Sequence, residues 1–131
     1  GNNGLAIRYP GSGDTAYVGM CELQVLDDTA KKYAKLHPAQ YHASAYGMVA
    51  AERGYQRPVG DWNFQQVTVA GSTITVEMNG TRILTADLAN VEKPMYDINK
   101  FKGRLRKSGF FGFAGHGDAV SFRNVQIKSL K

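Results

Sequence analysis

An acidic and an amide side chain stand two residues apart in the stretch 17–28 of this 131-residue chain. Side chains alternate between the two faces of a strand, so Glu22 and Gln24 share one face. The opposite face carries only small or apolar residues, which favours packing against a core: Gly19, Cys21, Leu23 and Val25. A carboxyl and an amide held beside apolar Val18 and Met20 indicate a lined groove, with a solvated strand face as the alternative.

Other side chains in the sequence are of the types that handle sugars. Sugars bind to flat aromatic faces and planar hydrogen-bonding groups, and their acid–base cleavage needs carboxyl groups or a carboxyl–histidine pair. The candidates are Arg8, Tyr46, Trp62, Asn63 and His116. His116 lies between two glycines in a predicted turn, which favours an exposed position. For Trp62, a buried position in the core is an equally good alternative to a sugar-binding role. We therefore predict a carbohydrate site around Glu22 and Gln24.

Metal and phosphate sites are not indicated. The three histidines have no ligand-type spacing with the single cysteine, so no structural zinc site is predicted. A hard cation held by Asp27, Asp28 and backbone carbonyls stays open as an alternative. The glycine-rich stretch 109–117 lacks the Lys-Ser/Thr ending of a phosphate loop. The sequence thus predicts no resident metal and no cofactor.

The net charge of +5 is concentrated in one loop. Its basic residues are Lys100, Lys102, Arg104, Arg106 and Lys107. The rest of the chain is close to neutral, which argues against a general polyanion-binding surface. The stretch 107–114 resembles the glycine–aromatic motif of RNA-binding sheets, but one extra Phe breaks the alternation that base stacking requires. We predict no nucleic-acid partner, while polyanion binding by the basic loop alone stays open.

Composition indicates one folded domain over residues 1–131. The chain is 43% apolar and 21% charged, which excludes a disordered class. It contains no apolar run of about 18 residues, so no membrane span is predicted. A single Cys21 excludes an internal disulfide. Fifteen glycines with frequent Val, Thr, Phe and Tyr favour short strands joined by tight turns.

These patterns predict an all-β fold, an antiparallel two-sheet sandwich of the jelly-roll kind. Strands are expected at residues 4–9, 17–28, 45–50, 61–69, 73–78, 81–87, 110–114 and 119–127. Residues 29–37 are expected to form about two helical turns that stop before Pro38.

The most specific local pattern is a hairpin. Asn79-Gly80 between two alternating runs predicts a two-residue loop with positive φ at both positions. That loop pairs Met78 with Thr81, Glu77 with Arg82, and Val76 with Ile83.

Six sequence motifs occur in a characteristic order. They are Gly1-Asn-Asn-Gly-Leu-Ala-Ile-Arg8, Glu22-Leu-Gln-Val-Leu-Asp27, Ala45-Tyr-Gly47, Pro58-Val-Gly-Asp-Trp-Asn63, Asn79-Gly80, and Gly115-His-Gly117 with Phe122-Arg-Asn-Val-Gln-Ile127. Together they resemble the C-terminal part of a 3-keto-disaccharide hydrolase domain, a concanavalin-like jelly-roll family. The family's usual Gly-Glu-Trp-Asn is Gly60-Asp-Trp-Asn63 here. Family members begin earlier, with strands that complete both sheets.

The resemblance implies a glycoside hydrolase or lyase for 3-keto-disaccharides or related glycosides. A carbonyl at carbon 3 acidifies the neighbouring C–H, so one positioned base can eliminate the glycosidic oxygen. Glu22 or His116 is the expected base, with the other as acid, and Arg8 would stabilise negative charge. The remaining candidates would orient the sugar: Gln24, Tyr46, Trp62 and Asn63. A bacterial protein in the periplasm or outside the cell is also implied.

Two further expectations accompany this hypothesis. A non-catalytic, lectin-like domain on the same sandwich is the rival class, and it would bind sugars without cleaving them. A sandwich without its first strands would also expose apolar sheet faces and unpaired edges. We therefore expect association with another chain that supplies the missing strands.

Overall fold

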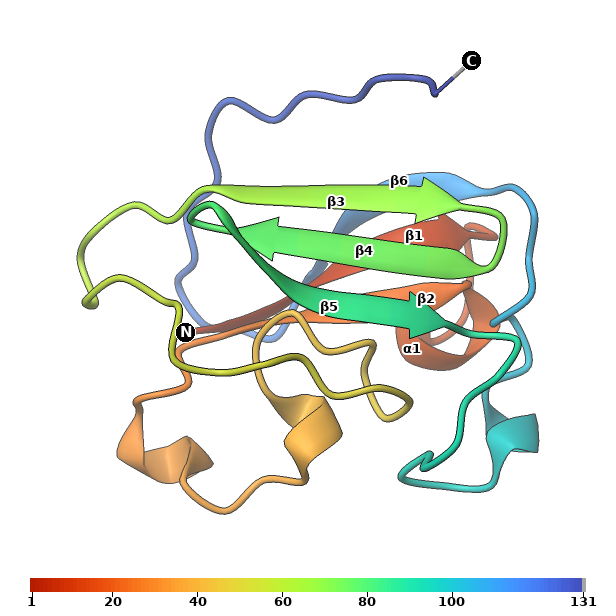
Figure 1. The fold of residues 1–131 in the computed structure, drawn as a ribbon, viewed down its shortest axis with the longest axis horizontal. Coiled ribbons are helices and arrows are strands. Elements are labelled where there is room, and N and C mark those ends of the chain that lie inside the picture. The colour runs from red at the N-terminus through yellow and green to blue at the C-terminus, as the bar shows by residue number, and fades with distance from the viewer. Residues whose placement is uncertain (131) are drawn as a thin grey trace.

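Two antiparallel three-stranded sheets pack face to face in the computed structural model, which describes residues 1–130 (Figure 1). The first sheet has the order β2-β1-β6, with β1 at Asn2–Tyr9, β2 at Cys21–Leu26 and β6 at Phe110–Gly115. The second has the order β3-β4-β5, with β3 at Gln65–Ala70, β4 at Thr73–Met78 and β5 at Thr81–Asp87. The predicted all-β antiparallel sandwich is confirmed.

The core lies between the two sheets. Cys21 and Leu23 are 0% exposed, which confirms that this face of β2 packs inward. The facing layer comes from the hairpin, where Ile74, Val76 and Met78 alternate with more exposed residues along β4. Further buried side chains close the ends of this core: Met20, Met48, Leu88 and Phe101.

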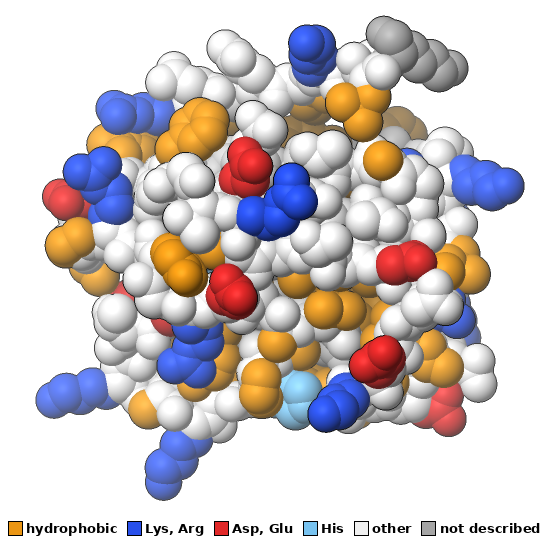
Figure 2. Space-filling model, viewed as in Figure 1, with side chains coloured by type: hydrophobic (Ala, Val, Ile, Leu, Met, Phe, Trp, Pro, Cys, Tyr) orange, Lys and Arg blue, Asp and Glu red, His pale blue; other side chains and the backbone are white. Residues whose placement is uncertain are grey.

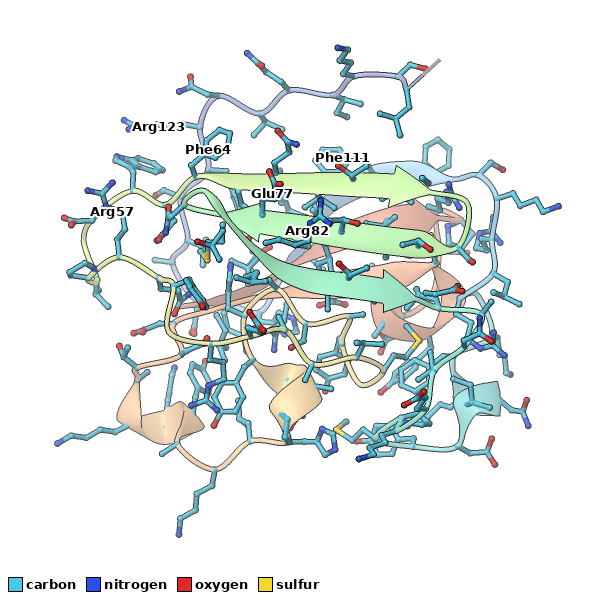
Figure 3. All side chains as sticks on the ribbon, in the orientation of Figure 1. Arg57, Phe64, Glu77, Arg82, Phe111 and Arg123 are labelled. Atoms are coloured by element: carbon cyan, nitrogen blue, oxygen red, sulfur yellow. The ribbon has the colours of Figure 1, made fainter. Side chains whose placement is uncertain are left out.

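The hairpin pairing is confirmed near its turn and corrected beyond it. Asn79 and Gly80 have φ of 50° and 89°, as a two-residue loop requires. Glu77 pairs with Arg82, and both lie on the outer face of the sheet (Figure 3). The predicted pair of Val76 with Ile83 is wrong, because the register shifts after Glu77 and Val76 pairs with Leu84. This irregularity buries two consecutive β5 side chains, Ile83 and Leu84.

Several predicted strands differ from the structure. The strand expected at 61–69 begins only at Gln65, after an exposed loop. Residues 45–50 form only isolated bridges, in which Ala45 contacts Leu23 and Val49. Residues 119–127 are not a strand, because no neighbouring strand pairs with them in the described part of the chain. Alternation of apolar residues therefore identifies segments that can form a strand. It does not show whether a neighbouring strand is present to pair with each segment.

Helical segments are short. Tyr17 and Val18, expected at the start of a strand, lie in α1 (Thr15–Val18). The helix expected at 29–37 is reduced to the 3-10 turn η1 (Lys31–Tyr33), and Pro38 begins the next turn, η2 (Pro38–Gln40), because proline suits a first helical position. A third turn, η3, spans Ile98–Lys100. Among residues 1–130 there is no helix with the length and apolar character needed to cross a membrane.

A buried histidine joins the loop after η2 to both sheets. His42 is 7% exposed, its Nδ1 accepts a hydrogen bond from the Leu26 amide at 3.2 Å, and its Nε2 lies 2.8 Å from Gln65 Oε1. The first contact needs an unprotonated Nδ1, so Nε2 carries the proton and donates to Gln65. Burial lowers the pKa of His42. Burial also raises the pKa of the adjacent Asp28, although its carboxylate accepts the His42 amide.

We predict that the free energy of unfolding falls as the pH drops below about 6.5, the ordinary pKa of histidine. The unfolded chain binds a proton at His42 that the folded chain excludes, with a limiting slope of about 1.4 kcal/mol per pH unit. Asp28 acts in the opposite sense at lower pH, because its raised pKa makes the folded state the better proton acceptor. Urea unfolding from about pH 7 to about pH 5 measures this dependence. The neutral variant His42→Gln should flatten it, and parallel curves would contradict the assignment.

Candidate active site

The outer face of the β2-β1-β6 sheet is hollowed by small residues. Glu22 pairs with Ala6 and Gln24 pairs with Gly4, so each long polar side chain stands beside a short one. A Cβ added to Gly4 would overlap the Glu22 carboxylate. The carboxylate therefore lies across β1 in space that only glycine leaves free.

A pocket of about 300 Å³ opens over this face. Its lining combines strand residues with α1, η1, η2 and the end of β6: Asn2, Asp14, Ala16, Tyr17, Glu22, Gln24, Leu26, Tyr33, Leu36, Gln40, Tyr46 and His116. Glu22 and Gln24 thus line a pocket and are at most 6% exposed, so they do not form a solvated strand face. Val18 and Met20, expected on the same face, are not part of this lining, and Met20 lies in the core.

Glu22 forms the centre of the site. The Thr15 hydroxyl donates a short hydrogen bond to Glu22 Oε2, and His116 Nε2 lies 3.4 Å from Oε1. The Glu22 side chain is 7% exposed and that of His116 is 45% exposed, so the imidazole is the outer member of the pair. A buried carboxylate with both oxygens engaged is a fixed acceptor, and it can orient and stabilise a protonated imidazole.

Local structure fixes the partners of Glu22. The Asp14 side chain caps α1 by accepting the Ala16 amide at 3.0 Å, and this holds Thr15 in the first turn. Strand β6 ends at Gly115, so His116 follows directly from the sheet. Both partners thus come from points where a regular element begins or ends.

A chain of amides forms the opposite wall. Gln24 Nε2 donates to the Gln40 carbonyl at 2.9 Å, and Gln40 Nε2 donates to Tyr46 Oη at 3.2 Å. Gln40 is itself fixed by a reciprocal capping arrangement with His37. Because Tyr46 Oη accepts this bond, its own proton is available to a molecule in the pocket.

Tyrosine faces complete the lining. Burial, with smaller contributions from Tyr46 and Tyr96, raises the pKa of Tyr17 to about 12. Tyr17 therefore keeps its proton at neutral pH and stays a hydrogen-bond donor. Tyr33 closes the mouth, where its hydroxyl donates to Asp118 at 3.2 Å.

A known protein family matches almost the whole chain. Residues 1–128 match the family described as the 3-keto-alpha-glucoside-1,2-lyase-like domain. The chain belongs to this family. A 3-keto-disaccharide hydrolase of Bacteroides thetaiotaomicron is 30% identical to it over 131 aligned residues, which cover 87% of this chain and 45% of the relative.

Solved structures show the same fold. A chain described as a "putative glycosyl hydrolase" from Parabacteroides distasonis superposes with a TM-score of 0.68 at 22% identity, covering 90% of this chain and 65% of that one. A second chain with that description, from the same species, has a TM-score of 0.59 at 19% identity, covering 89% and 58%. The family member described here thus spans under half of its curated relative and about three-fifths of these solved chains.

The structure brings four of the predicted site residues together and leaves three outside. Glu22, Gln24, Tyr46 and His116 line the pocket. Arg8, expected there as a charge stabiliser, instead donates to the carbonyls of Gly71 at 2.7 Å and Arg106 at 2.9 Å, and so joins the two sheets.

Trp62 and Asn63 lie in the loop before β3, away from the pocket lining. The Asn63 amide oxygen accepts the Arg57 amide at 2.8 Å and Asn79 Nδ2 at 2.9 Å, so it supports the hairpin turn. Trp62 is 45% exposed and stacks against the Arg123 guanidinium at 4.1 Å. The structure does not bring these two residues to the pocket, since residues 61–64 form an exposed loop before β3.

Several lining residues were missed by the sequence reasoning. Thr15 follows a capping aspartate after a Pro-Gly turn, which is a readable signal for a helix start. No sequence signal identifies Gln40, because its contact with Gln24 depends on how η2 lies over β2. Within residues 1–130 there is no cluster of three His, Cys, Asp or Glu side chains suited to a metal ion.

We predict that Gly4→Ala lowers the free energy of unfolding by about 1–3 kcal/mol, because its methyl group displaces the Glu22 carboxylate. Gly112→Ala is the matched control: it adjoins Ala6 on the same face of the sheet, and an added Cβ meets nothing within 4 Å. That variant should change stability by less than about 0.5 kcal/mol. Urea unfolding of both variants checks the difference, and equal effects would show that the space over Gly4 is not restricted.

Proposed function

We propose that the pocket binds a 3-keto-glycoside and cleaves it by elimination, with Glu22 and His116 as an acid–base pair. The observation that carries the proposal is the buried Glu22 carboxylate, held by Thr15 and lying 3.4 Å from a half-exposed imidazole. The description of the family as a 1,2-lyase-like domain and the name of its Bacteroides relative support this substrate class.

The set of acidic residues favours elimination over ordinary glycoside hydrolysis. Ordinary hydrolysis uses a pair of carboxyl groups on either side of the scissile bond. Among the described residues that line the pocket, the carboxylates are Glu22 and Asp14. Asp14 is engaged as the α1 cap, so Glu22 lacks a free carboxylate partner. A ketone at carbon 3 removes that requirement, because it makes the proton on carbon 2 acidic.

In the proposed reaction His116 is the base. Its Nε2 faces Glu22, which leaves Nδ1 for the substrate. Nδ1 takes the proton from carbon 2, and the electron pair of that C–H bond forms an enolate on the carbon 3 oxygen. The enolate then re-forms the ketone, a double bond forms between carbons 1 and 2, and the glycosidic oxygen leaves with its electron pair. The imidazolium, stabilised by Glu22, returns the proton to that oxygen. Water then adds across the double bond, with its hydroxyl on carbon 1 and a proton on carbon 2.

Neutral hydroxyl groups replace Arg8 as stabilisers of the enolate in this proposal. Tyr17 keeps its proton to about pH 12, and Tyr46 has a proton free to donate. Asn2 Oδ1 is buried and has no hydrogen-bond partner among the described residues, so we assign it to a sugar hydroxyl. A periplasmic or extracellular location stays a prediction of the family resemblance.

The alternative of polyanion binding by the basic loop receives little support. Arg104 donates to the Leu88 carbonyl at 3.2 Å and Arg106 to the Arg8 carbonyl at 3.1 Å. Lys100 lies over the Tyr17 and Tyr96 rings. These cations stabilise the fold. The outer face of the β3-β4-β5 sheet carries acidic and basic side chains interspersed, so it is not a basic surface either (Figure 2).

We predict that Glu22→Gln and His116→Gln each lower turnover of 3-keto-disaccharides by at least about 100-fold, since general acid–base catalysis contributes that much or more. Glu77→Gln is the control, because Glu77 is a carboxylate on the outer face of β4, away from the pocket. An NMR time course on 3-keto and ordinary disaccharides, with circular dichroism to verify folding, measures the effect. Saturable binding with no product in the wild type would instead favour the lectin-like class.

We also predict a primary kinetic isotope effect for a substrate deuterated at carbon 2, because the elimination breaks that C–H bond. Deuterium at carbon 4 is the matched control: it is also adjacent to the ketone but lies away from the glycosidic bond. Turnover rates of the two labelled sugars should differ, with only the first slowed. Equal rates for both would exclude rate-limiting proton removal at carbon 2.

A further inference from the structure

The turn that carries His116 depends on side chains for its position. It spans residues 115–118, and Gly117 has a φ of 77°, a conformation that residues other than glycine rarely adopt. Within the described part of the chain, no hydrogen bond between backbone groups outside the strand pairing involves residues 116–118. β6 ends at Gly115 and is an edge strand paired with β1 alone. Beyond the end of β6, side chains must therefore fix the turn.

The contact between His116 and Glu22 is too long to fix the imidazole by itself. His116 Nε2 lies 3.4 Å from Glu22 Oε1, whereas N–H···O hydrogen bonds of ordinary strength span about 2.7–3.2 Å. The His116 side chain is also 45% exposed, so packing restrains it only in part. An imidazole held in this way needs a second anchor close to it in the chain.

Asp118 supplies that anchor, two residues beyond His116. Its Oδ2 accepts a hydrogen bond from the Tyr33 hydroxyl at 3.2 Å and another from Lys32 Nζ at 3.3 Å. The hydrogen bond from Lys32 and the charge of that residue lower the pKa of Asp118, so its carboxylate is ionised at neutral pH. Both donors belong to η1, so one side chain ties the His116 turn to an element that lines the pocket.

The η1 side of this contact is well anchored. The Tyr41 hydroxyl donates to the Tyr33 carbonyl at 2.7 Å and accepts the Leu36 amide at 3.3 Å. Tyr41 is 3% exposed, and the Arg53 guanidinium lies 3.7 Å from the centre of its ring. A buried side chain thus fixes the backbone that carries Tyr33, and through Tyr33 it restrains the carboxylate of Asp118.

We propose that Asp118 is a positioning residue for His116, which holds the turn so that the imidazole stays beside Glu22. The proposal rests on the function proposed above, in which His116 is the base. Asp118 is not part of the pocket lining, so it acts through His116 and not on the substrate. The bond from Tyr33 contributes more than the ion pair, because the Lys32 side chain is 62% exposed and exposed ion pairs stabilise little.

The mobility of the turn tests the anchor without any reaction. NMR relaxation of the backbone amides should give order parameters of about 0.85 for residues 116–117 in the wild type, and below about 0.6 in Asp118→Ala. Asp118→Asn keeps an acceptor oxygen and should restore most of the order. Asp87→Ala is the matched control, because Asp87 is a partly exposed carboxylate that accepts the Ser72 hydroxyl away from the pocket. Circular dichroism verifies that each variant is folded.

Turnover of 3-keto-disaccharides separates positioning from a general structural role. Asp118→Ala should lower kcat by about 10- to 100-fold, because displacing a catalytic group by about 1 Å has effects of this size. KM should change by less than about twofold, since Asp118 does not touch the substrate. In the His116→Gln background the same change should lower kcat by less than about twofold, because residues that act as a unit have non-additive effects. A merely structural contact would lower kcat by the same factor in both backgrounds.

The outcomes decide between these roles. Loss of order and of kcat in Asp118→Ala, with both kept in Asp87→Ala, supports the proposal. It is overturned by a turn that stays ordered in Asp118→Ala, by one already mobile in the wild type, by an unchanged kcat, or by an equal fall in kcat with and without His116. A folded wild type that cleaves no 3-keto-disaccharide refutes the proposed function instead. The order parameters then decide alone whether Asp118 holds the turn.

Discussion

The arrangement depends on one buried carboxylate. A polar group removed from water costs free energy unless it finds hydrogen-bond partners inside the protein. Glu22 meets this constraint with the Thr15 hydroxyl on one oxygen and His116 near the other. Gly4 leaves space for the Glu22 carboxylate. Helix α1 positions Thr15, and His116 follows the end of β6. A glycine, a helix cap and a strand end thus act together to position the Glu22 carboxylate.

Period-two patterns and turn chemistry made much of the fold predictable. The faces of β2 and the turn at Asn79-Gly80 follow from local rules, and both were confirmed. The shift that pairs Val76 with Leu84 was not predictable, because Ile83 and Leu84 are both apolar and either could lie opposite Val76. Residues 119–127 show the general limit: alternation reports that a segment can be a strand, whereas pairing needs a neighbour elsewhere in the chain.

The site was predictable where one strand carries it and unpredictable where loops assemble it. Glu22 and Gln24 share a face by periodicity alone, and His116 was identified as an exposed turn histidine. Their meeting depends on β6 pairing with β1, which is a long-range event. Trp62 and Asn63 lie outside the pocket and make loop contacts, because residue types that bind sugars also stabilise loops. The type of a residue is therefore a weaker guide to whether it lies in the site than its position on a strand or helix.

The pocket depends on an edge strand. β6 carries His116 at its end and is also the unpaired edge of its sheet, held by β1 alone and through an irregular register between Ala6 and Tyr9. An edge strand with one neighbour has fewer hydrogen bonds to hold it than a central strand. The position of the His116 imidazole beside Glu22 therefore depends on how firmly β1 alone holds β6.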